Sequence, residues 1–157
     1  MALKTDIRGM RHTYPDFFEV GREKIREFAM AIKADDPASL NEDAAAELGH
    51  KGLVAPLTFL TLFAVLAQKD FFRVVDVGLE TMQIVQVDQK FIYHKPVVAG
   101  DRLWCHFDIV SVEERFGADI VVSRNTCVND NDEPVMVAYT TLMGQQSEKS
   151  AVIDFNA

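Results

Sequence analysis

The chain has 157 residues, a length that fits one domain with a sizeable core. Hydrophobic residues make up 48% of it and charged residues 25%, as in ordinary globular proteins. The net charge of −8 argues against a nucleic-acid-binding protein, because phosphate recognition needs clustered Lys and Arg. The first ten residues lack an apolar secretion signal, and the longest apolar stretch, residues 53–67, is too short for a membrane span. These features predict a cytoplasmic protein.

Two segments in the first third of the chain are predicted to be helical, residues 21–33 and 42–48. The first has apolar residues at helical spacing, which are Ile25, Phe28, Ala29 and Ile32. Asn41 precedes the second segment as an N-cap, and Gly49 follows it as a stop. We therefore expect two short helices that each bury one face.

Residues 57–69 form a third predicted helix of a different kind. This segment begins after Pro56 and has no polar face before Gln68. A helix that is apolar on all sides must be covered by other elements. At about 1.5 Å per residue it would be roughly 20 Å long.

After Arg73 the apolar pattern changes to a period of two, which is typical of strands. The alternating apolar residues, expected to share the core face, are Val85, Val87, Phe91, Tyr93, Leu103, Cys105, Phe107, Ile109, Ile120, Val122, Val135, Val137, Tyr139 and Met143. Turn-like breaks lie at residues 96–101, 113–117 and 129–134. Four strands with short breaks predict an antiparallel meander. We expect an α+β fold in which this sheet curls around the long central apolar helix, with one open face that joins a second subunit.

Several local sequences resemble those of hot-dog-fold dehydratases. Phe91 and the run Pro96-Val97-Val98-Ala99-Gly100-Asp101-Arg102-Leu103 are similar to the passage that joins two strands in MaoC-like dehydratases. The block 28–59 resembles the hydratase motif region and the central helix that follows it. The segments similar to the non-catalytic HadA and HadC subunits of the mycobacterial (3R)-hydroxyacyl-ACP dehydratase are 14–16, 21–28, 55–59 and 83–89. Residues 75–82 and 115–122 favour the HadC type.

This resemblance implies a single hot-dog domain over residues 1–146, followed by a loose tail at 147–157. It also implies a role in fatty acid synthase II elongation toward mycolic acids, where water is removed from a (3R)-hydroxyacyl chain on acyl carrier protein. Members of the family need no metal or cofactor for this step. The implied partner is a catalytic hot-dog subunit of the HadB type.

The hydratase motif, G-D-x-N-P-[LIV]-H, supplies an Asp and a His for proton transfer. The matching stretch here is Lys33-Ala34-Asp35-Asp36-Pro37-Ala38-Ser39, so Ala34 and Ser39 replace the catalytic pair. Neither side chain can act as a general acid or base at neutral pH. We therefore expect no catalytic residue in this chain.

The remaining expected role is to hold the acyl chain and its carrier. The candidate residues for an acyl tunnel are Leu57, Thr58, Thr61, Ala64 and Val65, although such side chains usually just pack a core. The candidates for docking the acidic carrier protein are Lys51, Lys90, Lys95 and Arg102, chosen by charge alone.

Two alternatives stay open. The chain could form a non-enzymatic acyl-binding homodimer. It could also be a hot-dog thioesterase that uses Asp35 or Asp36 with water, although Asp before Pro37 is common in turns. His50 is the nearest imidazole to these carboxylates and reads as a surface residue. Cys105 and Cys127 are predicted to be buried free thiols.

Overall fold

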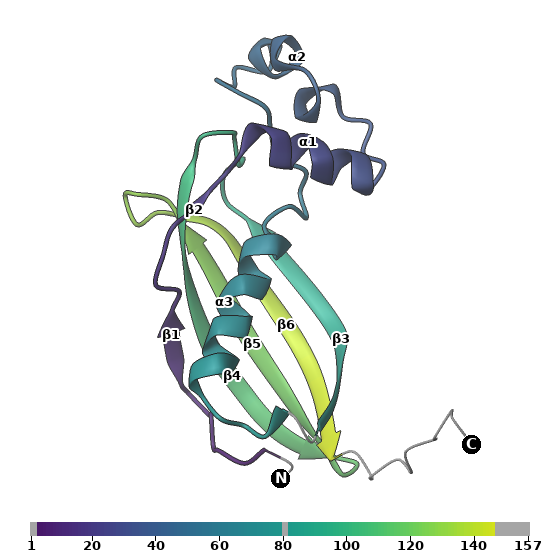
Figure 1. Cartoon of the computed structure of the whole chain (residues 1–157), viewed down its shortest axis with the longest axis vertical. Coiled ribbons are helices and arrows are strands. Elements are labelled where there is room, and N and C mark those ends of the chain that lie inside the picture. The colour runs from purple at the N-terminus through teal and green to yellow at the C-terminus, as the bar shows by residue number, and fades with distance from the viewer. Residues whose placement is uncertain (1–2, 80–81, 147–157) are drawn as a thin grey trace, which may run out of the picture.

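The structure is a computed structural model that describes residues 3–79 and 82–146. In chain order the elements are β1 (Arg11–Thr13), β2 (Phe18–Glu19), α1 (Arg22–Ala31), the 3-10 helix η1 (Pro37–Ser39), α2 (Glu42–Glu47), α3 (Thr61–Val74), β3 (Met82–Tyr93), β4 (Arg102–Arg115), β5 (Ala118–Val128) and β6 (Pro134–Gln146). The antiparallel sheet has the order β1-β4-β5-β6-β3, and β2 also pairs with β4. Figure 1 shows the sheet curving around α3, with α1 and α2 beyond one end of that helix. The predicted α+β architecture is confirmed.

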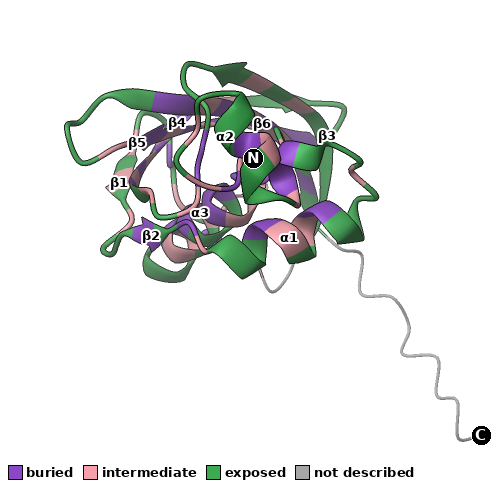
Figure 2. Ribbon diagram, turned by 90° about the horizontal axis from the view of Figure 1, so that it is seen from above, coloured by how far each residue is buried: buried purple, intermediate pink, exposed green. Residues whose placement is uncertain are grey.

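The core lies between α3 and the concave face of the sheet. Phe63, Ala67 and Phe71 recur at every fourth position of α3 and are fully or almost fully buried. The ring of Phe71 packs on that of Phe107 in β4, with ring centroids 4.9 Å apart. Figure 2 colours the residues by burial and shows buried residues on α3 and on the strands around it.

Helix α3 begins four residues later than predicted and extends five residues further, to Val74. The prediction ended at Lys69, just after the apolar run that stops at Ala67. The helix continues because Phe71 and Phe72 extend its core-facing stripe, while Asp70 and Arg73 form an ion pair on the same helix. Within the described residues, no helix is long and apolar enough to cross a membrane.

The sheet covers α3 from one side, as expected. Val65 and Leu66 on the other side of the helix remain 44% and 40% exposed. Strand β3 ends the sheet next to this open side, and its pairing within the described chain is with β6. The structure therefore leaves one apolar flank of α3 and one strand edge uncovered.

The predicted core face of β4 is confirmed, but that of β5 and β6 is wrong. Leu103, Cys105, Phe107 and Ile109 are all buried. In β5 and β6 the buried set is the opposite one, which includes Val121, Ser123, Asn125, Cys127, Met136, Ala138, Thr140 and Leu142. The predicted residues Ile120, Val122, Val137, Tyr139 and Met143 thus lie on the convex face, while Val135 is buried at the start of β6. Polar side chains occupy part of the concave face, which is why the alternation was assigned in the wrong phase.

Strand β3 differs from the prediction for a related reason. A β-bulge between Gln86 and Asp88 shifts its register against β6. Val85 and Val87 are therefore half-exposed instead of facing the core. Phe91 does face the concave side, because it pairs with the buried Ala138.

The two short helices begin and end within two residues of their predicted ends, at Arg22–Ala31 and Glu42–Glu47. The Asn41 side chain accepts hydrogen bonds from the backbone N–H groups of Asp43 and Ala44, at 2.7 and 3.2 Å, and so caps α2. Gly49 follows the helix with a φ of +84°, a conformation that favours glycine. The described residues end at Gln146 in β6, so the predicted tail at 147–157 lies outside them.

Candidate functional site

A chamber of about 360 Å³ lies between α3 and the concave face of the sheet. Its lining residues are Thr58, Thr61, Ala64, Val65, Gln68, Gln86, Gln89, Phe91, Asn125 and Thr140. Four of the five candidates for the acyl tunnel are among them, because they recur on one face at helical spacing. Leu57, the fifth, is 70% exposed and lines a separate cavity at the amino end of the helix.

Two further cavities lie along α3, one toward each end of the helix. One of about 350 Å³ lies at the amino end, between Leu57 and Leu60 on one side and Tyr93 on the other. One of about 380 Å³ lies at the carboxyl end, and it shares Gln68 with the chamber. The 14 residues of α3 span about 21 Å. We call these three cavities, which follow one another along the helix, the α3 groove.

The chamber contains a band of polar residues that the sequence did not predict. The Gln89 carboxamide donates from Nε2 to the backbone oxygen of Tyr139 at 2.8 Å. Its Oε1 accepts from the Thr140 hydroxyl at 3.0 Å and from Gln86 Nε2 at 3.3 Å. These bonds fix the polar band in place across β3 and β6. The apolar alternation assigned Thr140 to the opposite face, and the bulge at residue 87 hid the inward direction of Gln86.

The two positions of the missing catalytic pair lie in the loop before α2. Ser39 is 2% exposed, and its hydroxyl donates to the backbone oxygen of Val54 at 2.7 Å. This bond ties the η1 turn to the segment that leads into α3. Ala34 offers only a methyl group. The Ser39 hydroxyl therefore makes a structural contact, and the Ala34 methyl group can neither donate nor accept a proton.

The candidate thioesterase carboxylates are placed like turn residues. The Asp36 side chain accepts a hydrogen bond from the backbone N–H of Ala38 at 3.0 Å and caps η1. Asp35 is exposed. His50 and His94 line the amino-end cavity with Lys95, but no carboxylate is among that cavity's lining residues. The structure thus does not bring Asp35 or Asp36 into a cavity with an imidazole.

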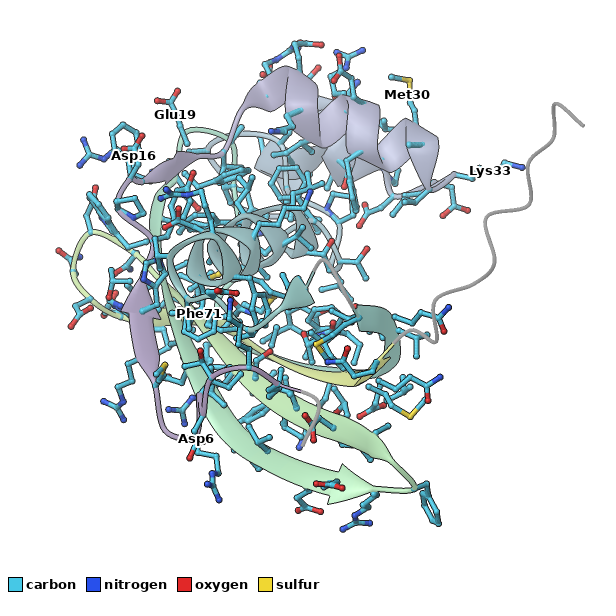
Figure 3. The ribbon with its side chains drawn as sticks, turned by 60° about the horizontal axis from the view of Figure 1, so that its bottom comes forward. Asp6, Asp16, Glu19, Met30, Lys33 and Phe71 are labelled. Carbon is cyan, nitrogen blue, oxygen red and sulfur yellow. The ribbon has the colours of Figure 1, made fainter. Side chains whose placement is uncertain are left out.

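An imidazole–carboxylate pair exists elsewhere. His12 Nε2 on β1 lies 2.7 Å from Asp70 Oδ2 on α3, and both side chains are largely buried. Hydrogen bonds from Arg73 and then from His12 hold the pKa of Asp70 below its ordinary value. The His12 ring lies edge-on to the ring of the buried Phe71, which is labelled in Figure 3, with centroids 6.2 Å apart. The pair ties β1 to the carboxyl end of α3.

Three of the four candidate docking cations gather at one depression. Lys51, Lys95 and Arg102 line a surface hollow of about 340 Å³. Two of them have acidic partners, because Lys95 pairs with Glu133 and Arg102 lies 3.5 Å from Asp130. Lys90 lies apart on β3, with its ammonium group 5.9 Å from the centre of the Tyr139 ring. The gathered cations are therefore partly neutralised.

Known proteins share this fold and sequence. The family described as "FAS1-like, dehydratase domain region" matches residues 8–138. The UPF0336 protein Rv0637 of Mycobacterium tuberculosis is 68% identical over 151 residues, which cover 96% of this chain and 91% of that protein. A chain of the C-terminally truncated HadBC (3R-hydroxyacyl-ACP dehydratase) complex from Mycobacterium tuberculosis superposes with a TM-score of 0.85 and 65% identity, over 90% of this chain and 99% of that chain. A MaoC-like dehydratase superposes with a TM-score of 0.83 and 33% identity, over 90% of this chain and 43% of that longer chain.

These matches fix the class of the protein. Its fold is the hot-dog fold of MaoC-like dehydratases, as the sequence predicted. The chain belongs to the FAS1-like dehydratase-domain family.

Proposed function

We propose that this chain is the auxiliary, acyl-binding subunit, of the HadC type, in a heterodimeric (3R)-hydroxyacyl-ACP dehydratase. The reaction removes the C2 proton and the C3 hydroxyl of the acyl chain as water and leaves a trans-2-enoyl thioester. The Asp and His that transfer these protons are supplied by a partner subunit of the HadB type. The replacement of both motif positions by Ala34 and Ser39 carries this proposal. In the cell the complex serves cytoplasmic fatty acid synthase II elongation toward mycolic acids.

The open side of the α3 groove supports a complex in which a partner subunit transfers the protons and this chain binds the acyl chain. Val65 and Leu66 are exposed along α3, and the neighbouring strand β3 lies at the edge of the sheet. An unpaired strand edge beside an apolar surface is well suited to a second, similar subunit. The partner would extend the sheet at β3 and close the groove, so that a long chain starting at the partner's catalytic pair continues along Thr58, Thr61, Ala64 and Val65.

The carrier protein would approach the hollow lined by Lys51, Lys95 and Arg102. Acyl carrier proteins are acidic, so cations near the groove would increase the rate of encounter. Lys51 contributes most in this scheme, because Lys95 and Arg102 already face acidic groups. Lys90 is not among the residues that line this hollow, and it is a candidate for a separate contact.

Purification of the chain alone and together with its catalytic partner tests the proposal. We expect the pair to co-purify with a mass of one copy of each, and to hydrate crotonyl and longer enoyl thioesters. The chain alone should show no hydration above background. Strong hydration activity of the isolated chain would contradict the assignment, and so would a stable homodimer that does not bind the catalytic partner.

A further inference from the structure

The convex face of the sheet carries apolar side chains at positions where solvent-facing polar ones are common. An antiparallel sheet that packs one face on the core usually presents polar side chains on the other. Here the outward positions of β5 and β6 hold apolar side chains that the period-two pattern assigned to the core, which are Ile120, Val122, Val137, Tyr139 and Met143. Strands that are apolar on both faces are typical of a sheet that is covered on both faces. The pattern therefore indicates a second layer on the convex face.

The pairing of the strands arranges the outward side chains in two apolar rows. Directly opposed residues on paired strands point to the same face of a sheet. Val85 lies opposite Met143, and Met143 lies opposite Ile120, so one row crosses β3, β6 and β5. Ile92 lies opposite Val137 and forms a second row on β3 and β6. Val85, Met143 and Ile92 are 50%, 36% and 37% exposed, so both rows present apolar surface to solvent.

The charged side chains between the two rows are nearly balanced. Arg124 donates a hydrogen bond to Asp108 at 2.9 Å, and Arg11 lies 3.2 Å from the same carboxyl group. Lys90 and Asp88 stand two residues apart on the same face of β3 and carry opposite charges. An acidic carrier protein or an anionic membrane surface is attracted by clustered, unpaired cations. The nearly neutral face instead favours a partner surface that is itself apolar and nearly neutral.

We propose that the convex face packs on the same face of a second copy of this chain, sheet on sheet. The two-fold axis lies in the plane of contact and crosses the strands at Gln89, between Asp88 and Lys90. Lys90 of each copy then lies opposite Asp88 of the other copy, so the contact is self-complementary in charge. The same rotation places the row of Ile92 on the row of Val85, with apolar side chains on both sides. The convex face points away from α3 (Figure 1), so this inference goes beyond the acyl-binding function proposed above.

Sedimentation equilibrium of the full-length chain, both alone and with its catalytic subunit, tests the inference. We expect the mass to rise with concentration to that of an assembly that contains two copies of this chain. Val122→Lys should weaken this association by about 100-fold or more, because each copy would bring an unpaired ammonium group into the contact. Val74→Lys is the matched control, because Val74 is half-exposed at the end of α3 and lies outside the sheet. This control should associate like the wild type.

Charge exchange on β3 tests the two-fold arrangement itself. Asp88→Lys alone brings two ammonium groups together, and Lys90→Asp alone brings two carboxylates together. Each single variant should therefore weaken the association by about tenfold. The double variant exchanges the two charges and should restore the wild-type association constant. Effects on folding are measured separately, as the melting temperature of each variant.

Four outcomes would overturn the inference. The first is a wild-type assembly that contains one copy of this chain at every concentration. The second is association that survives in Val122→Lys, since the copies would then meet at another surface, such as the edge of β3. The third is a double charge variant that stays dissociated, and this result decides the matter if Val122→Lys does not fold. The fourth is a single-copy wild type whose binding of acyl carrier protein is lost in Val122→Lys, which would assign the convex face to the carrier.

Discussion

A tryptophan at position 61 should shorten the range of acyl chains that the dehydratase complex accepts. Thr61 stands in the first turn of α3, and its side chain lines the chamber. The lining runs along the helix from Thr58 to Gln68, which is about 15 Å of the groove. An indole in this space would block the path of any chain that continues past residue 61.

The size of the effect follows from the apolar surface that is lost. Each methylene that the indole keeps out of the groove loses about 0.8 kcal/mol of transfer free energy. Four excluded methylenes amount to about 3 kcal/mol, or roughly a 200-fold loss in kcat/KM for long chains. Chains that end before residue 61 should lose little.

The assay is hydration of enoyl thioesters from four carbons upward by the complex of the Thr61→Trp chain with its catalytic partner. Val74→Trp is the matched control, because Val74 is 53% exposed at the last turn of the same helix. We expect the control to keep the chain-length profile of the wild type. Equal losses at every chain length in Thr61→Trp would refute the tunnel.

Three further predictions concern stability. Asp70→Asn should lower the melting temperature at neutral pH and make the melting temperature decline less steeply in acid. Because the pKa of Asp70 is depressed in the folded state, the stabilisation by its carboxylate is complete above about pH 4 and is lost as the pH falls through the lower folded-state pKa. Asn41→Ala removes the N-cap of α2 and should lower the free energy of unfolding by about 1 kcal/mol, which corresponds to a melting temperature about 2–4 °C lower. An unchanged melting temperature would mean that the cap does not stabilise the protein. Phe107→Ala should cost about 3–5 kcal/mol in denaturant unfolding, because this fully buried ring packs on Phe71, and a loss below 1 kcal/mol would contradict the described core.

Local signals in the sequence predicted the two short helices well. The N-cap at Asn41 and the stop at Gly49 depend on neighbouring residues alone, so their effects can be read from the sequence. Four tunnel candidates gathered in one chamber for the same reason, since spacing along a helix fixes which residues share a face.

The strands were harder because period two does not say which of the two faces is buried. In β5 and β6 the concave face includes Ser123, Asn125 and Thr140, polar residues that a hydrophobic pattern assigns to solvent. The β-bulge after Gln86 then reverses which alternate side chains of β3 point to the concave face. The polar band of the chamber depends on both features, and it could be located only once the strands were placed side by side.

The role of this chain as a helper without its own proton-transfer residues is tested most directly by inactivating the partner. The hydration rate of a long enoyl thioester would be measured for the complex in which the partner's catalytic Asp and His are both replaced. We predict a rate at the uncatalysed background, with the complex still assembled. A substantial rate that persists in that complex would mean that this chain performs the chemistry itself.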